Sequence, residues 1–304
     1  FALFADFEYY WHRNNLVNRF IQVLEFKPFT INLKGSLRHY DKPLVAGIIN
    51  VTPDSFYAGS RVNNADAIKK RVAAMIEEGA DWIDLGAYSS RPGASEVSPQ
   101  EEIERLASGM KAIRSISHDI PVSIDTFRAK VAETAIRELD ADIINDISGG
   151  DLDTDMFRTV ASLNVPYILM HMRGTPATMT SMTQYSDVTA EVLAELSGKL
   201  ERLSLLGVSD IIIDPGFGFA KDVAQNYTLL RNLKLFNIFD RPLLVGISRK
   251  SMIYRPLGIS PEQSLNGTTV INTIALLSGA AILRVHDVKE AVEAIKIVNL
   301  TYNP

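Results

Sequence analysis

The chain has 304 residues, of which 46% are hydrophobic and 22% are charged, a composition typical of a globular protein with a large core. Its formal net charge of -5 argues against a nucleic-acid partner, which requires a basic face. The sequence contains no cysteine, which excludes disulfides, thiolate catalysis and zinc–thiolate sites. No apolar run approaches the ~20 residues that a membrane span needs. The first residues lack the basic flank and the cleavage site of a secretory signal, so we expect a cytoplasmic enzyme without a membrane partner.

Residues 1–27 differ in pattern from the rest of the chain. They are rich in aromatic residues and show no clear apolar stripe. We therefore expect an N-terminal extension of unknown role, followed by a single domain over residues 28–304. Residues 33–40 are predicted to form a short strand or a hairpin that closes the bottom of this domain.

Short apolar runs that end in polar residues recur along the domain, and segments with helical period lie between them. Continuous β-branched runs are typical of parallel strands that are buried on both faces. About eight such strand–helix units can be counted, which favours a (β/α)₈ barrel over a doubly wound open sheet. The runs cover residues 44–49, 82–85, 122–124, 143–144, 167–170, 211–213, 243–247 and 282–283.

One helical segment, residues 270–277, is apolar nearly all round. A helix of this kind is buried on both sides. Because the barrel can cover only one side, we expect a second copy of the chain to cover the other and to form a homodimer.

The ends of the predicted strands carry polar side chains, and in a barrel these ends meet at one mouth where catalytic residues gather. Asn50 ends the first strand and offers an amide oxygen to a hard cation such as Mg²⁺. The segments that follow the first two strands are long enough to form lids. Residues 87–94 also carry hydroxyls and an arginine that suit a charged substrate.

Three further strand ends carry Asp125, Asn145 and Asp214. Ionised carboxylates only accept hydrogen bonds, so this set suits a planar heterocycle whose edge presents N–H donors. Each aspartate could instead cap the next helix, but three such residues at one mouth favour a binding site. Asp146 is the better candidate for a cap.

Basic residues follow the last two strands, in Ser248-Arg249-Lys250-Ser251 and in Arg284-Val285-His286. This quadrant of a barrel is a frequent phosphate site. Because neighbouring side chains alternate along a strand, Arg249 is expected to point away from the mouth. His171 has no partner at ligand spacing, which predicts a hydrogen-bonding role and not a zinc site.

The segments GIINVTPDSF, SSRPG, SIDT, INDISGG, LMHMRGTP, DPGFGFAK, LLVGISRKSMI and RVHDVKEA together resemble dihydropteroate synthase, the folate-pathway enzyme that sulfonamides target. They follow the family order from about Lys34 to Asn299. The resemblance implies the condensation of 6-hydroxymethyl-7,8-dihydropterin pyrophosphate with p-aminobenzoate, which releases pyrophosphate and uses Mg²⁺.

The resemblance also implies a role for each matching residue. The pterin would be bound by Asp125, Asn145, Met170, Asp214, Phe219, Lys250 and Arg284, of which Asp125, Asp214, Lys250 and Arg284 would be catalytic. The pyrophosphate would be bound by Asn50, Arg91, Arg284 and His286, with Asn50 as the metal ligand. The p-aminobenzoate would be bound by Phe56, Ser90, Arg91, Pro92, Lys250 and Ser251.

Three positions depart from the pattern of the family. Tyr88 stands where a glutamate is common, Ser90 where a threonine is common, and Ala220 where a glycine is frequent. These departures bear on loop behaviour and on drug sensitivity. The first 27 residues lie outside the resemblance.

Two other functions would use a similar barrel. A corrinoid-dependent methyltransferase acting on methyltetrahydrofolate would share the acidic pterin residues, but it would not need the Ser-Arg-Lys-Ser segment. A non-catalytic pterin- or phosphate-binding barrel would not need the two long loops or Asn50.

Overall fold

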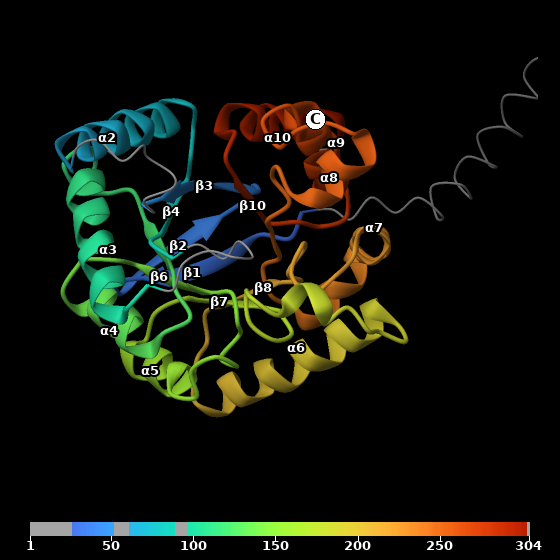
Figure 1. The fold of residues 1–304 in the computed structure, drawn as a ribbon, viewed down its shortest axis with the longest axis horizontal. Helices are drawn as coiled ribbons and strands as arrows, with labels where there is room; N and C mark the ends of the chain where they lie inside the picture. The colour runs from blue at the N-terminus through green and yellow to red at the C-terminus, as the bar shows by residue number, and fades with distance from the viewer. Residues whose placement is uncertain (1–25, 52–60, 89–96, 303–304) are drawn as a thin grey trace, which may run out of the picture.

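The computed structural model describes residues 26–51, 61–88 and 97–302, and these form a barrel of parallel strands surrounded by helices (Figure 1). The strand order is β8-β7-β6-β5-β4-β3-β10-β9. An isolated parallel bridge between Ile213 and Leu243 joins the two ends of this series and closes the barrel. The prediction of a (β/α)₈ barrel in place of an open sheet is confirmed.

The predicted strands and helices appear in the expected order. The barrel strands are β3 (Leu44–Asn50), β4 (Trp82–Gly86), β5 (Val122–Asp125), β6 (Ile143–Asp146), β7 (Tyr167–Met170), β8 (Ile211–Asp214), β9 (Leu244–Val245) and β10 (Ile282–Val285). The α-helices are α2 (Arg61–Glu77), α3 (Pro99–Arg114), α4 (Ala129–Arg137), α5 (Met156–Leu163), α6 (Val188–Leu205), α7 (Val223–Arg231), α8 (Ser251–Leu257), α9 (Leu265–Leu277) and α10 (Val288–Tyr302). The described residues also form two 3₁₀ helices, η2 (Met179–Ser181) and η3 (Leu233–Phe239).

Burial of the strands on both faces explains their sequences. Every residue of β4, β6, β7 and β8 is buried, because the barrel interior covers one face and the helices cover the other. None of the described helices has both the length and the apolar character that would let it cross a membrane.

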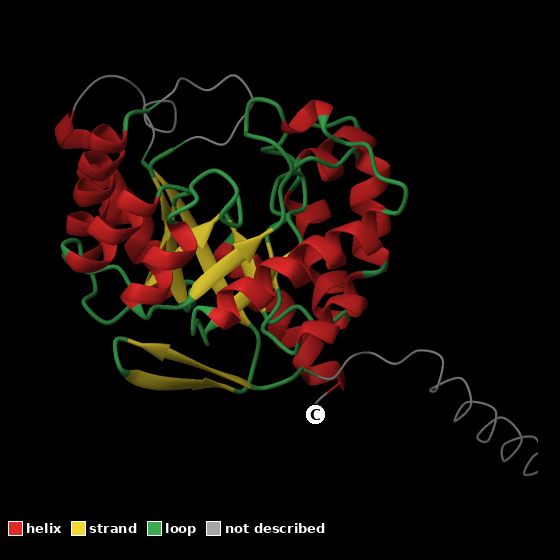
Figure 2. Ribbon diagram, turned by 90° about the horizontal axis from the view of Figure 1, so that it is seen from below, coloured by secondary structure: helices red, strands yellow, loops and turns green. Residues whose placement is uncertain are grey.

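An antiparallel hairpin of β1 (Phe29–Leu33) and β2 (Ser36–Tyr40) lies beneath the barrel, at the end from which the strands start (Figure 2). Its two-residue turn has positive φ at Lys34 (51°) and Gly35 (81°), the backbone that suits a tight hairpin. Ile31 is buried with residues of the barrel strands. The expected hairpin is therefore present, although it begins at Phe29 and not at residue 33.

Helix α9 is only half covered within one chain. Ile271 and Leu276 are each 5% exposed and face the barrel, whereas Val270 is 52% exposed and Ile274 is 41% exposed. The expectation that this helix is buried all round is therefore not met by a single copy of the chain.

We expect Ile31→Ala to destabilise the protein by about 2–5 kcal/mol, because it removes a buried side chain from beneath the barrel. Leu37→Ala lies on the same hairpin, but Leu37 is 74% exposed, so a change within ~0.5 kcal/mol is expected. Denaturant unfolding measures both. Equal losses in the two variants would contradict this role of the hairpin.

Candidate active site

The register of the barrel strands places the predicted polar residues in one row at the mouth. Asn50 pairs with Gly86, Gly86 with Asp125, and Asp125 with Asn145. A Cβ atom on Gly86 would lie 3.1 Å from the side-chain oxygen of Asn50 and 3.5 Å from the Cβ of Asp125. Glycine at this position therefore leaves room for the polar side chains on either side.

Arg284 of β10 joins Asp125 of this row to Asp84, which lies two residues before Gly86 on β4. Its Nε donates to Oδ2 of Asp84 at 2.6 Å, and its Nη2 donates to Oδ2 of Asp125 at 2.8 Å. The other oxygen of Asp84 accepts from Ser123 (2.5 Å) and from the amide nitrogen of Asn145 (3.2 Å). Asp84 is 1% exposed and thus fully desolvated. The orientation of Arg284 is fixed by these bonds.

The titration of these groups reflects their burial. Burial raises the pKa of Asp125, and the nearby Asp84 adds to this, while Arg284 opposes it. Burial alone would lower the pKa of Arg284, but Asp84 and Asp125 outweigh burial and raise it above its ordinary value. The pair of carboxylates around one guanidinium leaves an excess of acceptors, which suits a ring that presents N–H groups.

Lys250 enters the mouth from the start of α8. Its Nζ donates to the carbonyl of Phe217 at 2.5 Å and lies 4.5 Å from the ring centroid of Phe219. Burial lowers the pKa of Lys250 to about 8, against the opposing effect of Asp214. A Cβ atom on Gly218 would lie 2.9 Å from Cδ of Lys250, so this lysine needs a glycine beside it.

Asp214 ends β8 and is 5% exposed. Its Oδ1 accepts from the backbone N–H of Gly216 at 2.7 Å. Burial raises the pKa of Asp214, and Lys250 is the main opposing group. One oxygen of Asp214 thus shapes the loop that follows, while Lys250 and Arg284 provide the opposing charge. Asp214 does not cap the next helix, the role weighed as an alternative, because Asp222 is the N-cap of α7.

An apolar wall lies beside these charges. Met170 and Phe219, both predicted to line a slot for a planar ring, belong to one buried cluster. The other buried members are Ile147, Met172, Met179 and Ala220. Apolar side chains next to desolvated acceptors are the arrangement that small-molecule sites typically use.

The basic residues that follow the last two strands do not all face the mouth of the barrel. Oγ of Ser248 lies 3.1 Å from Nδ1 of His286, and Ser251 begins α8 next to Lys250. Arg249 points outward and bonds both carboxylate oxygens of Asp287, at 2.9 and 2.6 Å. Strand alternation is not the reason, because β9 ends at Val245 and Arg249 has a left-handed φ of 57°.

Four predicted site residues, Phe56, Ser90, Arg91 and Pro92, lie outside the described residues. So do residues 1–25, which make up most of the expected extension. Ser90, one of the three positions that depart from the family pattern, is among these four. Ala220 adopts a left-handed φ of 49°, which explains why a glycine suits its position. The Tyr88 ring packs edge-on against Phe127 at 5.1 Å.

Two buried residues of the site were not singled out from the sequence. Asp84 lies in the middle of β4, whereas the sequence pattern pointed to strand ends; a carboxylate inside an apolar run was the available signal. Lys221 lies in the loop between β8 and α7 and is 7% exposed. His171, predicted to be a hydrogen-bonding residue, lies 2.9 Å from Nζ of Lys221 and 3.0 Å from Glu195.

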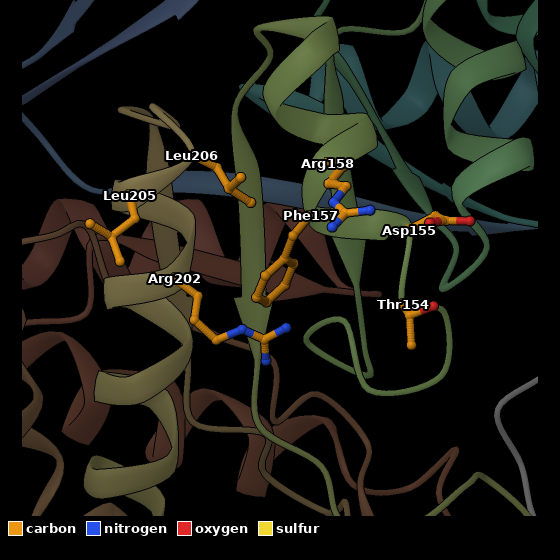
Figure 3. Close-up of a pocket in the computed structure, with 7 residues that line it drawn as sticks. All are labelled: Thr154, Asp155, Phe157, Arg158, Arg202, Leu205 and Leu206. Atoms are coloured by element: carbon orange, nitrogen blue, oxygen red, sulfur yellow. The ribbon is translucent and has the colours of Figure 1, made fainter.

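A separate hollow of about 530 Å³ lies on the outside of the barrel, between α5 and α6 (Figure 3). Thr154, Asp155, Phe157, Arg158, Arg202, Leu205 and Leu206 line it. It shares no residue with the mouth, so we do not count it as part of the candidate site.

The chain is similar to known proteins over most of its length. The family model described as pterin binding enzyme matches residues 46–286. The dihydropteroate synthase of Escherichia coli K12 is 40% identical over 270 residues, which cover 88% of this chain and 95% of that protein. The Synechocystis enzyme of the same name is 42% identical over 258 residues, or 84% of this chain and 89% of that protein.

Solved structures agree with these relatives. The Yersinia pestis dihydropteroate synthase in a sulfonamide drug complex has a TM-score of 0.84 and 38% identity, and the match covers 91% of this chain and all of that one. The Xanthomonas albilineans dihydropteroate synthase with 4-aminobenzoic acid has a TM-score of 0.83 and 34% identity. That match covers 90% of this chain and 98% of the other. The closed barrel, the charged mouth and the match to the family model together define the chain as a pterin-binding enzyme. Within that class, the chain belongs to the dihydropteroate synthase family.

We expect Asp84→Asn to weaken pterin binding by about 10- to 100-fold, because Arg284 loses a charge-assisted bond and an unpaired donor faces it. Asp81→Asn is a matched control three residues earlier on the chain, where the carboxylate accepts from the backbone of Val45 at 2.8 Å. The control should affect stability only. Calorimetric titration with a pterin measures the difference, and equal affinities in the two variants would contradict the role of Asp84.

Proposed function

We propose that the protein condenses 6-hydroxymethyl-7,8-dihydropterin pyrophosphate with p-aminobenzoate to give 7,8-dihydropteroate and pyrophosphate, a step of folate biosynthesis. The observation that carries this proposal is the desolvated Asp84–Arg284–Asp125 cluster, which lies at one mouth with Lys250 and Asp214. The family relationship supports it. So do the solved Xanthomonas albilineans structures, one with 4-aminobenzoic acid and another in complex with 7,8-dihydropteroate.

The pterin ring would occupy the space between the charged row and the apolar wall. Asp125 and Asp214 would accept hydrogen bonds from ring N–H groups, and Asn145 can both donate and accept. Met170 and Phe219 would contact the ring faces. Lys250, held by the Phe217 carbonyl, would donate to a ring acceptor.

In the reaction, the bond between the pterin methylene carbon and the pyrophosphate oxygen breaks, and pyrophosphate leaves with the bonding electrons. Positive charge then develops on the pterin, where Asp125 and Asp214 favour it. Arg284 and His286 would stabilise the charge of the leaving group. The amine nitrogen of p-aminobenzoate forms the new C–N bond and loses one proton. An aromatic amine is neutral at pH 7, so no strong general base is required.

The proposal includes Mg²⁺ as the cofactor. Among the described residues, no group of three or more His, Asp or Glu side chains could hold a metal ion. Asn50 offers one amide oxygen, which fits a Mg²⁺ ion that is bound mainly by substrate phosphates and water. When bound, Mg²⁺ would neutralise charge on the pyrophosphate. Asn50 would then hold it at the mouth.

The remaining assignments rest on the resemblance of the sequence. Arg91 and His286 are proposed for the pyrophosphate. The p-aminobenzoate end would be formed by Phe56, Ser90, Arg91, Pro92, Lys250 and Ser251. We likewise propose a cytoplasmic location and a place among the enzymes that sulfonamides target.

We also propose that the protein is a homodimer. Val270 and Ile274 of α9 are exposed, and so are Ile297 and Leu300 of α10, at 65% and 66%. Helices α9 and α10 pack against each other, so these side chains lie on adjacent helices. An apolar surface of this kind is typical of an interaction site.

Incubation with the pterin pyrophosphate, p-aminobenzoate and Mg²⁺ tests the function. We expect release of pyrophosphate together with formation of dihydropteroate, each dependent on both substrates. Binding of pterin without turnover would indicate a non-catalytic barrel. Methyl transfer from methyltetrahydrofolate to a corrinoid would indicate the alternative enzyme.

We predict that Lys250→Ala lowers turnover by about a hundred- to a thousandfold, because a preorganised charge at the reacting centre is removed. Arg249→Ala, one residue away, removes a cation that points outward to Asp287. It should lower stability and leave turnover largely intact. Steady-state kinetics on folded variants gives the comparison, and equal rate losses would show that the orientation of the two side chains is misassigned.

The rate should fall on the alkaline side with a midpoint near the pKa of Lys250. This pKa is lowered to about 8, so the ammonium is present below that pH and is lost as the pH rises through it. We expect kcat/KM for the pterin substrate to decline above pH 8. A profile that stays flat to pH 10 would argue against a required charge on Lys250.

Ile274→Glu should convert the proposed dimer to a monomer, because it places a charge in the apolar surface of α9. Leu205→Glu is the control, since Leu205 is 82% exposed on α6. Light scattering at micromolar concentration should give twice the chain mass of 33.6 kDa for the wild type and the control. A monomeric wild type would refute the dimer.

A further inference from the structure

The loop between β8 and α7, residues 215–222, folds around one of its own side chains. Lys221 is 7% exposed, and its Nζ donates to the carbonyls of Gly216 (3.0 Å) and Phe219 (2.9 Å). The third partner of Nζ is Nδ1 of His171, at 2.9 Å. An ammonium group has three N–H donors, so each of them is used.

His171 connects this lysine to the helical layer. Because Nδ1 accepts from Lys221, the neutral ring carries its proton on Nε2 and donates it to Glu195 of α6 at 3.0 Å. Glu195 is held in turn by Nε of Arg173 at 3.0 Å. The loop is thereby anchored to α6 through a chain of side chains that lies behind the mouth.

The loop needs this anchor because its backbone is unusual. Gly216, Gly218 and Ala220 alternate in left-handed conformations, with φ of 72°, 79° and 49°. Turns of this kind leave backbone carbonyls pointing inward, where they need donors. Lys221 supplies two of these donors, and Asn226 holds the opposite side by accepting from Gly218 at 2.7 Å.

Three contacts of the candidate site come from the same loop. The Phe217 carbonyl accepts a hydrogen bond from Lys250, and the Phe219 ring lies 4.5 Å from the same ammonium. The Gly216 N–H donates a hydrogen bond to Asp214. In the described part of the chain, Nζ of Lys221 makes no hydrogen bond to Lys250 or Asp214, although its charge interacts with both. Lys221 can therefore affect the site in two ways, through the shape of the loop and through its charge near Asp214.

A role in stability alone explains this arrangement poorly. Burying a cation has a large desolvation cost, and an apolar side chain of similar length would fill the same volume without it. The ammonium instead fixes two carbonyls and one imidazole at defined positions. Burial also lowers the pKa of Lys221 to about 7, and the charge of Asp214 is the main effect that opposes this.

We propose that Lys221 is a positioning residue of the pterin site, which holds the loop in the shape that presents the Phe219 ring and the Phe217 carbonyl. This inference rests on the proposed function. The mechanism above does not use Lys221, since Lys250 is the lysine that faces the substrate.

The variant Lys221→Met keeps the length of the side chain and removes the three donors. We expect the Kd for the pterin to rise by about ten- to a hundredfold, because a small displacement of a preorganised group has effects of this size. Lys199→Met is the matched control. Lys199 is also buried, at 9% exposure, and donates to the Ser148 carbonyl (3.2 Å) and to Asp151 (2.6 Å), but it does not contact the β8–α7 loop. The control should lose stability and keep the pterin Kd of the wild type.

Two further measurements do not depend on turnover. Amide hydrogen exchange at residues 216–220 should become faster in Lys221→Met and stay unchanged in Lys199→Met. The pKa of His171, lowered to about 4 by burial and by Lys221, should rise in the NMR titration of Lys221→Met. If Lys221→Met does not fold, His171→Leu removes one of the three acceptors of Lys221. This variant should show a smaller rise in the pterin Kd and a smaller increase in exchange at residues 216–220.

The outcomes separate this inference from the proposed function. A pterin Kd in Lys221→Met equal to that of the wild type would overturn the positioning role, and so would an equal loss in Lys199→Met. A wild type that binds pterin but forms no dihydropteroate would overturn the proposed function, while the exchange and affinity comparisons would still decide the role of Lys221.

Discussion

The guanidinium of Arg284 bonds the carboxylates of Asp84 and Asp125 at the barrel mouth, where the side chains are 15%, 1% and 16% exposed. Buried charges of this kind have a desolvation cost of several kcal/mol each, which close partners must offset. Removing the cation would leave two carboxylates facing each other in a medium of low dielectric constant. The site therefore depends on this ion-pair cluster for the charge state of its acceptors.

The rest of the mouth is arranged around that cluster. Asn145 and Ser123 hold the far oxygen of Asp84, so Arg284 meets a carboxylate that cannot turn. Opposite this cluster, Lys250 provides a second cation, and the β8–α7 loop provides the aromatic ring of Phe219. A planar ring between them would find acceptors at its edge and apolar surface on its face. Fixed groups of this kind are effective because they need no reorganisation during the reaction.

Barrel closure brings these parts together from distant points in the sequence. Arg284 and Asp84 are 200 residues apart, but they lie on β10 and β4, which both pair with β3. The hairpin of β1 and β2 covers the opposite end. The barrel thus separates a lower end that is closed by apolar side chains from an upper end that holds the charges, a division common to this fold.

The sequence predicts the mouth well where one local rule suffices. Polar residues at the ends of buried runs lie at the mouth because parallel strands share a direction, and this rule places Asp125, Asn145 and Asp214. It does not find Asp84, which lies inside a strand and whose partner is distant in sequence. Nor does it give the correct reason for the direction of Arg249, since the run over residues 243–247 forms a strand of only two residues and then turns.

Side-chain burial on α9 also could not be derived from sequence alone. Apolar residues all round a helix predict cover on both sides, but the pattern does not say whether the same chain provides it. The left-handed backbone at Ala220 is a similar case. An alanine gives no sign of positive φ, and only the fold of the loop around Lys221 reveals it.

A double-mutant cycle between Asp84 and Arg284 tests the central claim most directly. The variants Asp84→Asn, Arg284→Met and the double variant would be compared in kcat/KM for the pterin substrate and in free energy of unfolding. If Asp84 acts by holding Arg284, the double variant should be no less active than Arg284→Met alone, and it should be at least as stable because one buried carboxylate has been neutralised. Losses that add across the two positions would contradict the claim that the mouth is organised around this ion pair.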